Sequence, residues 1–376
     1  MSNEWELLAG RLEDCLMGVS GGVNSLAPWN ENAFQGFALE VFAWQFELCA
    51  PYRSFCERRG ITPSSVSDWC EIPAVPTTAF KYFDLVSTPY PAGSRLPDAA
   101  FHTSGTTLGS ERRGRHFVPR ESLYRAAFHE PFRLALLPDF DRIRVISLIP
   151  SPIAVPHSSL SWMAGMAVDA FAEDVDWLIH ANGEWSQGAL DVLRAASAEE
   201  APVLMLGTAL AFLHLTEAFA DEVGVGLPVG SRAMVTGGFK GVRRAIGRGE
   251  LYSAIAAYTG IEEDRIVSEY GMTELLSQMY EPVLTEGSGA TGKQVAPPWL
   301  RVRVLDPTSL KDQPEGERGL ISFFDLANLG SVSHVITEDL GILEEGRLRV
   351  LGRVSGSEPR GCSRAMDDLM AGSGDL

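Results

Sequence analysis

Apolar and polar positions are arranged in three different ways along the chain, and each arrangement predicts a different kind of element. Over residues 1–100, apolar side chains recur at intervals of three and four, most clearly in NAFQGFALEVFAWQFELC (32–49), and Gly60 closes the stretch that follows. This spacing puts the apolar side chains on one face of a helix. The proline-punctuated IPAVPTTAFKYF (72–83) predicts mainly extended chain. We therefore expect a helical N-terminal part over residues 1–100.

From about residue 142 the pattern changes to short apolar runs followed by helical stretches. The runs are RIRVISLIP, APVLMLG leading into TALAFLHLTEAFADEVG, SRAMVTGG and DRIVSEYGMTELL. Strands that alternate with helices predict a mostly parallel sheet, in an α/β subdomain that we place at residues 101–294. Ligands of such sheets bind just past the carboxyl ends of the strands, where Gly237, Gly238, Gly271 and Thr273 are expected.

After residue 295 the chain contains short runs of alternating apolar and polar residues, which predict strands, separated by turn residues. The runs are WLRVRVLD, ERGLISFFDL, SHVITEDLG and GRLRVLGR. They predict an antiparallel sheet or a small barrel over residues 295–354. The remaining residues, 355–376, are small and acidic, and we expect a short C-terminal tail there.

Composition narrows the function classes. The chain has 376 residues, 45% of them hydrophobic, and its net charge of −18 comes from 49 acidic against 31 basic side chains. This charge repels nucleic-acid phosphates and anionic lipids, so we expect no nucleic-acid partner. No apolar run is long enough to span a membrane and the acidic N-terminus is unlike a signal peptide, so we expect a cytoplasmic protein. Five scattered cysteines without a CxxC pair argue against a disulfide framework and a zinc site.

The run HTSGTTLGSERRG (102–114) places glycines and hydroxyl side chains before Arg112 and Arg113, and Arg115 follows directly after it. Glycines let backbone amides approach a phosphate, and hydroxyls add donors to its oxygens. The run lacks the lysine of the GxxxxGK[ST] phosphate loop, and similar clusters form ordinary polar loops, so both alternatives stay open on this run alone. The candidate phosphate-binding residues are Thr103, Ser104, Gly105, Thr106, Thr107 and Gly109.

The run SEYGMTE (268–274) follows an apolar stretch. Its residue types suit a nucleotide: Tyr270 to stack on a purine, Gly271 for a turn, Thr273 for the α-phosphate and Glu274 for Mg²⁺. The alternative is an ordinary strand-to-helix turn with Thr273 near the helix cap.

Four segments, in this order, resemble the adenylate-forming enzymes, a family that includes acyl-CoA synthetases and the adenylation domains of peptide synthetases. TSGTTLG is similar to the phosphate loop of that family, although Ser110 and Glu111 stand where relatives often have proline or lysine. YGMTE, which includes Met272, is similar to the nucleotide and magnesium segment. The resemblance implies ATP and Mg²⁺ as cofactors, with Glu274 as the metal ligand.

The other two segments lie near the C-terminus. TEDLG (337–341) resembles the family's Thr-Gly-Asp segment, which implies that Asp339 holds the ribose hydroxyls, and Glu338 replaces the usual glycine. GRVSGSE (352–358) resembles the hinge that contains an arginine, here Arg353. GGFKG (237–241) falls where the family has a glycine-rich segment beside the adenine and the acyl group, which implies these roles for Gly237 and Gly238.

The chain departs from the common pattern after Arg353. Most members continue with a mobile lid that carries a catalytic lysine, and only residues 354–376 follow here. We therefore expect an α/β adenylate-forming core with parallel sheets flanked by helices and a small antiparallel β subdomain, without the lid. PAVPTTAFK, HSSLSWM, DLANLG and GRVSGSEPRGCS resemble one branch, the acyl-protein synthetases of the bacterial luminescence fatty-acid reductase complex.

That resemblance implies an ATP-dependent ligase that activates a carboxylic acid, in this branch a fatty acid, as an acyl-adenylate. The enzyme has to orient two anions and spread the developing charge. Without the lid lysine, the candidate cations are Lys240, Arg112, Arg113 and Arg115, each of which is equally well explained as part of a solvated basic surface.

The resemblance also implies that Cys362, flanked by Arg360 and Arg364, accepts the acyl group and passes it to a partner reductase. Neighbouring positive charge favours a thiolate, although a lone cysteine is by default inert. The alternatives are delivery to coenzyme A, a carrier protein or an amine, and a degenerate nucleotide-binding or scaffold subunit. An unrelated binding module would require the ordered segments to match by accident.

His157, in VPHSSLSWM, suits a base for the incoming nucleophile or a residue beside the substrate carboxylate. A histidine satisfied by neighbouring backbone is the equal alternative. An apolar acyl pocket is conceivable around Phe239, Trp162, Met163 and Met166, although ordinary core packing explains each of them better.

Overall fold

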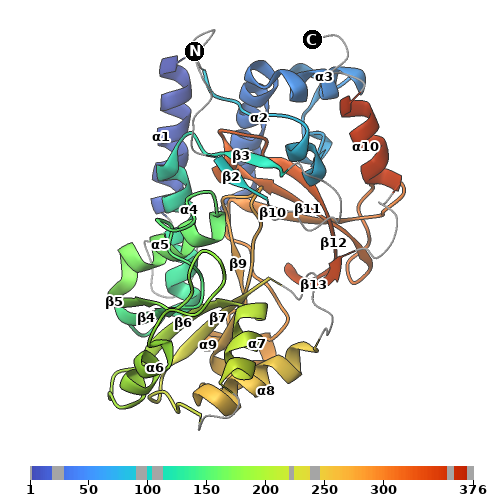
Figure 1. The fold of residues 1–376 in the computed structure, drawn as a ribbon. Helices are drawn as coiled ribbons and strands as arrows, with labels where there is room; N and C mark the ends of the chain where they lie inside the picture. Colours follow the sequence, from blue (N-terminus) through green and yellow to red (C-terminus); the bar gives the residue numbers. More distant parts are fainter. Residues whose placement is uncertain are drawn as a thin grey trace. The chain divides into compact units, whose positions relative to one another are not determined.

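The helices predicted near the N-terminus are present in the computed structural model (Figure 1). Helix α1 spans Ser2–Gly18, α2 Glu31–Leu48 and α3 Ala50–Arg58. The Asn30 side chain caps α2 by accepting a hydrogen bond from the Asn32 amide, as a capping asparagine does. The apolar spacing read from the sequence becomes the buried face of α2. The structure describes residues 2–18, 29–89, 100–103, 113–219, 224–237, 246–353 and 360–370.

Two compact units divide the chain. Unit 1 consists of Met1–Glu130, Met272–Gln278 and Ala296–Leu376, and unit 2 consists of Pro131–Gly271 and Met279–Val295. The seven residues Met272–Gln278 therefore belong to unit 1, although the chain on both sides of them belongs to unit 2. Helix α4 (Glu121–Leu136) contains the first boundary, next to Pro131.

The sheet of unit 1 is mainly antiparallel, as predicted. Among the described residues it has five strands, in the order β1-β12-β11-β10 with β13 also paired to β12. The bounds are Val75–Pro76 for β1, Leu300–Leu305 for β10, Arg318–Asp325 for β11, His334–Glu344 for β12 and Arg347–Arg353 for β13. Strand β1 pairs in parallel with the start of β12, and β13 pairs antiparallel with its end.

Shorter elements complete unit 1. Strands β2 (Ala100–His102) and β3 (Arg115–Phe117) form a hairpin. The 3₁₀ turns are η1 (Pro63–Ser65), η2 (Trp69–Glu71), η3 (Thr77–Lys81) and η6 (Leu326–Asn328). The extended chain predicted for IPAVPTTAFKYF is wrong over Thr77–Lys81, which form η3, whereas Val75–Pro76 form a strand. Helix α10 (Arg360–Met370) lies within the residues expected to form a short tail.

The sheet of unit 2 is mostly parallel, as predicted from the alternation of strands and helices. Among the described residues its order is β5-β4-β6-β7-β8-β9, and only the two-residue edge strand β9 runs antiparallel. The strands are β4 (Ile143–Ser147), β5 (Ala172–Trp177), β6 (Val203–Thr208), β7 (Arg232–Thr236), β8 (Ile266–Tyr270) and β9 (Met279–Tyr280). The helices are α5 (Ser159–Phe171), α6 (Ala189–Ser197), α7 (Ala209–Ala218), α8 (Arg248–Thr259) and α9 (Val283–Glu286), with 3₁₀ turns η4 (Glu263–Arg265) and η5 (Ser288–Ala290).

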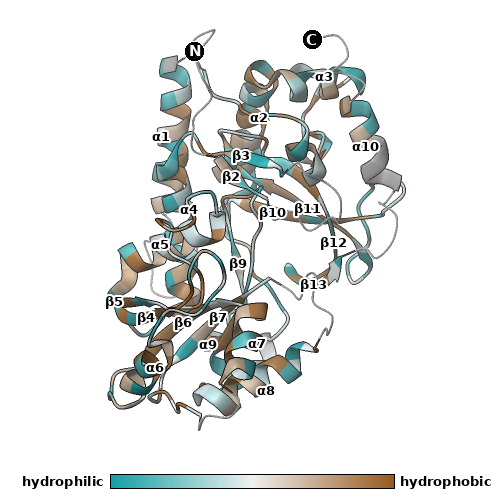
Figure 2. Cartoon of the chain, in the orientation of Figure 1, coloured by the Kyte–Doolittle hydropathy of each residue, from teal (hydrophilic) through white to brown (hydrophobic). Residues whose placement is uncertain are grey.

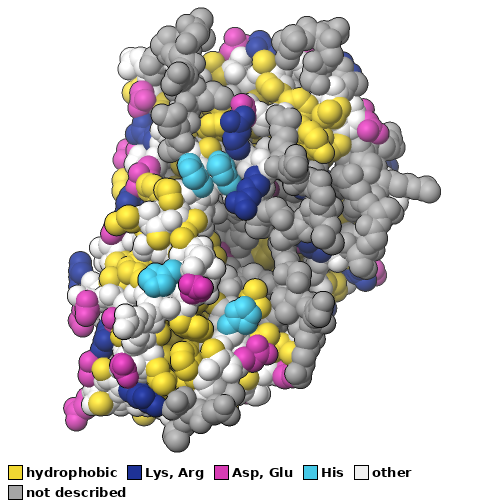
Figure 3. All heavy atoms as spheres, viewed as in Figure 1, with side chains coloured by type: hydrophobic (Ala, Val, Ile, Leu, Met, Phe, Trp, Pro, Cys, Tyr) yellow, Lys and Arg dark blue, Asp and Glu magenta, His cyan; other side chains and the backbone are white. Residues whose placement is uncertain are grey.

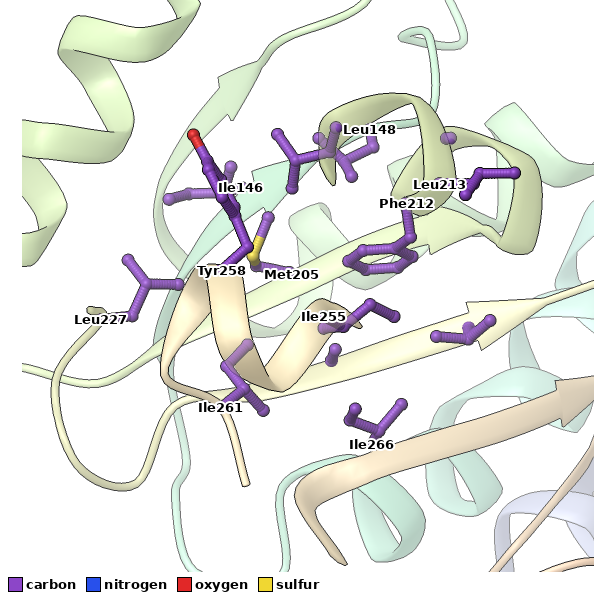
Figure 4. Close-up of a cluster of buried hydrophobic side chains, with 14 of the residues drawn as sticks. Ile146, Leu148, Met205, Phe212, Leu213, Leu227, Ile255, Tyr258, Ile261 and Ile266 are labelled. Atoms are coloured by element: carbon purple, nitrogen blue, oxygen red, sulfur yellow. The ribbon is translucent and has the colours of Figure 1, made fainter. Parts of the chain in front are cut away.

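The core of unit 2 explains the apolar side chains of its central strands, most clearly in VLMLG of β6. Met205 of β6, Ile266 of β8, Phe212 of α7 and Ile255 of α8 are all fully or almost fully buried in one cluster (Figure 4). Figure 2 shows hydrophobic colour on the central strands, interrupted by hydrophilic residues such as those of β5 (AEDVDW) and β8 (IVSEY), and both colours on the helices of the unit. Parallel strands covered by helices show this pattern.

The surface of the described residues carries a mixture of side-chain types. On the face shown in Figure 3, basic, acidic and apolar side chains lie interspersed. No helix of the described residues is long and apolar enough to cross a membrane.

Candidate active site

The hydroxyl-rich run connects strands β2 and β3 along the chain, and the structure describes its two ends. Thr103, directly after β2, donates its amide hydrogen to the Gly114 carbonyl, and its Oγ1 accepts the Gly114 amide hydrogen, both at 2.9 Å. These two hydrogen bonds close the base of the loop. The predicted phosphate-binding residues Ser104, Gly105, Thr106, Thr107 and Gly109 lie outside the described residues, as does Arg112.

The SEYGMTE run ends strand β8 and then leaves the sheet. Tyr270, half-buried, is the last residue of β8 and pairs with Met279 of β9. Met272–Gln278, all described, form no helix, so the alternative of a strand-to-helix turn with Thr273 near a cap is wrong. We call Met272–Gln278 the catalytic-candidate loop, because it contains Thr273 and Glu274.

A buried carboxylate holds one half of the catalytic-candidate loop. Asp325, at the end of β11, is fully buried. Its Oδ2 accepts the amide hydrogens of Leu276 and Ser277, both at 2.9 Å. Its Oδ1 accepts hydrogen bonds from the Ser277 hydroxyl at 2.7 Å and from the Ala327 amide at 3.1 Å. The four donors stabilise the charge of Asp325 and fix the loop backbone.

Two more buried side chains, His116 and Asn328, hold the first half of the catalytic-candidate loop. Nδ1 of His116, in β3, lies 2.5 Å from the Thr273 carbonyl oxygen. Nδ2 of Asn328, in η6, donates to the Glu274 carbonyl at 3.0 Å. His116 and Asn328 also meet, with Nε2 and Oδ1 2.9 Å apart. The backbones of both predicted catalytic residues are therefore fixed within unit 1.

Sequence reasoning missed these anchors. DLANLG (325–330) contributed to the family resemblance but received no role, and His116 was not noticed. The available signal was the pair of polar residues in an otherwise apolar run, since a buried Asp or Asn must have partners.

In unit 2 the candidate residues lie at the carboxyl edge of the parallel sheet. Gly237 directly follows β7 with φ at +69°, a value that favours glycine. Gly271 directly follows β8, and His157 lies in the connection after β4, exposed and next to Ser158, the N-cap of α5. Strands β4, β6, β7 and β8 are parallel neighbours, so their following loops leave the same edge. Gly238 and Lys240 lie outside the described residues.

Glu269 is a second site feature that the sequence did not reveal. This carboxyl, one residue before Tyr270, is buried, and burial raises its pKa to about 7. The Thr236 hydroxyl donates a hydrogen bond to it from the neighbouring strand β7 and opposes that rise. The carboxyl edge thus contains a group that titrates near neutral pH.

Asp339 and Arg353 come together in unit 1. Strands β12 and β13 are joined by Glu345 and Gly346, which both have positive φ, as a tight hairpin turn requires. The register shifts by one residue between Leu340 and Gly341, and this shift pairs Asp339 with Arg353, whose Nε donates to Asp339 Oδ1 at 3.1 Å. Arg353 also lies 3.6 Å from Glu338.

Other candidates have structural partners. Arg115 forms an ion pair with Asp84 at 2.6 Å, whereas Arg113 is exposed. Met163 and Met166 are buried on α5, which supports ordinary core packing for both. The Trp162 indole donates to the Pro156 carbonyl at 3.0 Å. Phe239 lies outside the described residues.

Cys362 occupies the first turn of α10, although its side chain is outside the described part. The end of α10 is anchored to unit 1 by the buried residues Ala365, Met366 and Leu369. An ion pair joins Asp368 to Arg59 of α3 at 2.8 Å.

Among the described residues, no cluster of three or more His, Cys, Asp or Glu side chains suits a metal ion. Mg²⁺ bound to a nucleotide needs only one or two protein carboxylates, because phosphate oxygens and water supply the other ligands. Glu274, on a loop whose backbone is fixed, fits such a site.

Comparison with known proteins identifies the family of this chain and solved structures with a similar fold. Residues 27–371 match the family described as acyl-protein synthetase, LuxE. A Vibrio harveyi protein named long-chain-fatty-acid–luciferin-component ligase is 24% identical over 346 residues, covering 86% of this chain and 84% of the relative.

Two solved structures share the fold at low sequence identity. A 2-hydroxyisobutyryl-CoA ligase in complex with 2-HIB-AMP has a TM-score of 0.64 at 16% identity, covering 86% of this chain and 68% of that one. ATP-bound MatB from Rhodopseudomonas palustris has a TM-score of 0.50 at 18% identity over 69% of this chain, which spans 49% of MatB. The predicted α/β fold of adenylate-forming enzymes is confirmed.

Proposed function

The chain belongs to the acyl-protein synthetase family, and from that premise we propose that it uses ATP to activate a fatty acid as an acyl-adenylate and then transfers the acyl group to a protein thiol. The V. harveyi relative is named for a long-chain fatty acid, which supports this substrate class. No part of the proposal depends on a nucleic acid.

In the first half-reaction a carboxylate oxygen of the acid attacks the α-phosphorus of ATP, and pyrophosphate leaves. The protein's task is to align two anions and to hold donors where charge develops. The main support is the catalytic-candidate loop: Asp325, His116 and Asn328 fix its backbone before any substrate binds. A preformed loop loses little entropy when it holds ATP.

We assign the roles within this site as follows. The hydroxyl-rich loop and Thr273 bind phosphate oxygens, and Glu274 holds Mg²⁺, which would reduce the repulsion between the acid and the phosphates. Tyr270 and the glycines after β7 border the adenine. Asp339 accepts hydrogen bonds from the ribose hydroxyls, while Arg353 balances its charge.

In the second half-reaction the thiolate of Cys362 attacks the acyl carbonyl, and AMP leaves. The first turn of a helix favours an anion, because unpaired backbone amides point toward it. Cys362 occupies this position in α10. The anchoring of α10 by Ala365, Met366, Leu369 and the Asp368 ion pair would hold the acceptor in place. From Cys362 the acyl group would pass to a reductase; coenzyme A, a carrier protein or an amine is the alternative acceptor.

ATP–pyrophosphate exchange tests the first half-reaction, the formation of the acyl-adenylate. Wild-type protein with Mg²⁺ should catalyse ATP–pyrophosphate exchange that depends on a fatty acid, and Glu274→Gln should lose roughly 100-fold or more of that rate because it removes a charge-stabilising group. The control Glu317→Gln changes an exposed carboxylate and should keep full exchange. If the wild type shows no exchange with any acid, the proposed function is wrong.

The same samples report on the acceptor. After incubation with ATP and acid, mass spectrometry should show a hydroxylamine-labile acyl adduct that is lost in Cys362→Ser, with exchange retained. Cys70→Ser is the matched control: Cys70 is exposed, but partial burial raises the pKa of its thiol to about 11, so it should not compete as a thiolate. An adduct that persists in Cys362→Ser would exclude Cys362.

A further inference from the structure

His116 has a contact for each of its ring nitrogens and no exposure to solvent. Nδ1 faces the Thr273 carbonyl oxygen at 2.5 Å, and Nε2 faces Asn328 Oδ1 at 2.9 Å. The ring of Phe80 packs edge-on against it, with ring centres 5.6 Å apart. The imidazole is therefore held in one orientation.

The neighbours decide where its proton lies. Asn328 Nδ2 donates to the Glu274 and Val332 carbonyls, both at 3.0 Å, so the oxygen of that amide must face His116. Both ring nitrogens thus face acceptors. Burial lowers the pKa of His116. The nearer acceptor is the Thr273 carbonyl oxygen, 2.5 Å from Nδ1, so Nδ1 carries a proton and donates it to that oxygen.

His116 also belongs to the hairpin that carries the hydroxyl-rich loop. It pairs with Phe101 of β2, and the hydrogen bonds between Thr103 and Gly114 follow two residues further along. One side chain therefore connects the base of the predicted phosphate loop to the backbone between Thr273 and Glu274.

We propose that His116 is a positioning residue for acid activation: its Nδ1 hydrogen bond to the Thr273 carbonyl fixes the backbone of Thr273 and Glu274 relative to Thr103 and Gly114, the described base of the hydroxyl-rich run. The inference rests on the proposed function. The catalytic-candidate loop contains Thr273 and Glu274, the proposed phosphate and metal ligands. An error of about 1 Å in the position of this loop is therefore expected to lower the rate of the chemical step roughly 100-fold.

Two substitutions separate the two contacts of His116. The side-chain amide of His116→Asn branches at Cγ, as Nδ1 does, and can keep the bond to Thr273. The amide of His116→Gln reaches one atom further, near Nε2, so it can contact Asn328 but not the Thr273 carbonyl. A residue that is merely structural would lose function to a similar extent in both variants.

The experiment compares wild type, His116→Asn and His116→Gln in ATP–pyrophosphate exchange. We expect His116→Asn to remain within about tenfold of the wild type, because a single hydrogen bond is altered. We expect His116→Gln to lose roughly 100-fold in kcat, with the KM for ATP changed far less. Equal losses in the two variants, or a loss confined to KM, would overturn the proposal.

A second measurement does not depend on activity. Amide hydrogen exchange of residues 272–278 should be faster in His116→Gln and unchanged in His116→Asn, since local opening reports how tightly this loop is held. If exchange in this loop is the same in all three proteins, the proposal fails. A wild type without ATP–pyrophosphate exchange would instead refute the proposed function, while the loop measurement would still report on His116.

Discussion

Two buried carboxylates, one in each unit, show how differently a folded chain can treat the same chemical group. Asp325 of unit 1 accepts hydrogen bonds from four donors, two of them amides of the catalytic-candidate loop. Glu269 of unit 2 accepts one, from the Thr236 hydroxyl, among the described residues. Both side chains are almost completely removed from water.

The number of donors decides what each group can do. Burial raises the pKa of both carboxyls, but the four donors of Asp325 oppose the rise. Asp325 is therefore suited to organise backbone amides. For Glu269 the pKa reaches about 7, so its charge changes near neutral pH. The first carboxylate is a fixed anchor, and the second is a titrating group at the carboxyl edge of the sheet.

The largest effect should come from removing the anchor. Asp325→Ala would leave buried amides of Leu276, Ser277 and Ala327 without an acceptor, which should cost about 3–5 kcal/mol of unfolding free energy. Urea denaturation measures this cost. Asp312→Ala removes an exposed carboxylate paired with Arg303 and should cost about 1 kcal/mol or less. Similar costs for the two variants would show that Asp325 is not an anchor.

The second effect is a pH dependence from Glu269. Its folded pKa of about 7 exceeds the ordinary value of 4.5, so its contribution to stability is fully present below pH 4.5 and is lost as the pH rises through 7. Above that range, ionised Glu269 should destabilise the protein by about 3 kcal/mol. Glu269→Gln keeps an acceptor for Thr236 without the charge.

We therefore expect Glu269→Gln to be more stable than wild type at pH 8 and close to it at pH 4.5, as measured by urea denaturation at both values. A stability difference that does not change with pH would contradict the assignment of Glu269.

The smallest effect should come from the Thr236 hydroxyl. Thr236→Val preserves shape but removes the donor to Glu269, which should cost about 1–2 kcal/mol at pH 8, where the carboxylate is charged. The same substitution in a Glu269→Gln background should cost less, and this double-mutant cycle isolates the interaction. Equal costs in the two backgrounds would mean that the hydroxyl does not stabilise the carboxylate.

Local sequence patterns predicted the main elements because each of those patterns lies within one element. VLMLG of β6 is an unbroken buried run, and each of the four runs after residue 295 forms one strand, although β11 is buried along almost its whole length instead of on one face. Strand β5, with the sequence AEDVDW, was not predicted because its acidic side chains are partly exposed at the sheet edge. Strands β1 and β9 have two residues each, which is too short to show a period.

The sequence pointed only to those candidate site residues that lie within a recognisable motif. Thr273 and Glu274 stand out in YGMTE, but the residues that hold them do not. Asp325 lies 49 positions from Leu276 and His116 lies 157 positions from Thr273, so their contacts exist only in the folded chain. Glu269 was missed because one glutamate in a strand does not reveal whether donors surround it. The roles of Asp339, Arg353 and Cys362 came from family resemblance, and these roles, like those of Thr273 and Glu274, stay predictions.

The anchoring of the catalytic-candidate loop also has a consequence for protein synthesis. The loop leaves the ribosome before Asp325 and Asn328, which follow it in the chain by about fifty residues. Until that later segment emerges, the amides of Leu276 and Ser277 have no acceptor and the loop cannot take its final shape. The nascent chain should therefore remain unable to activate a fatty acid until strands β10 and β11 have been made, even if the sheet of unit 2 has already formed.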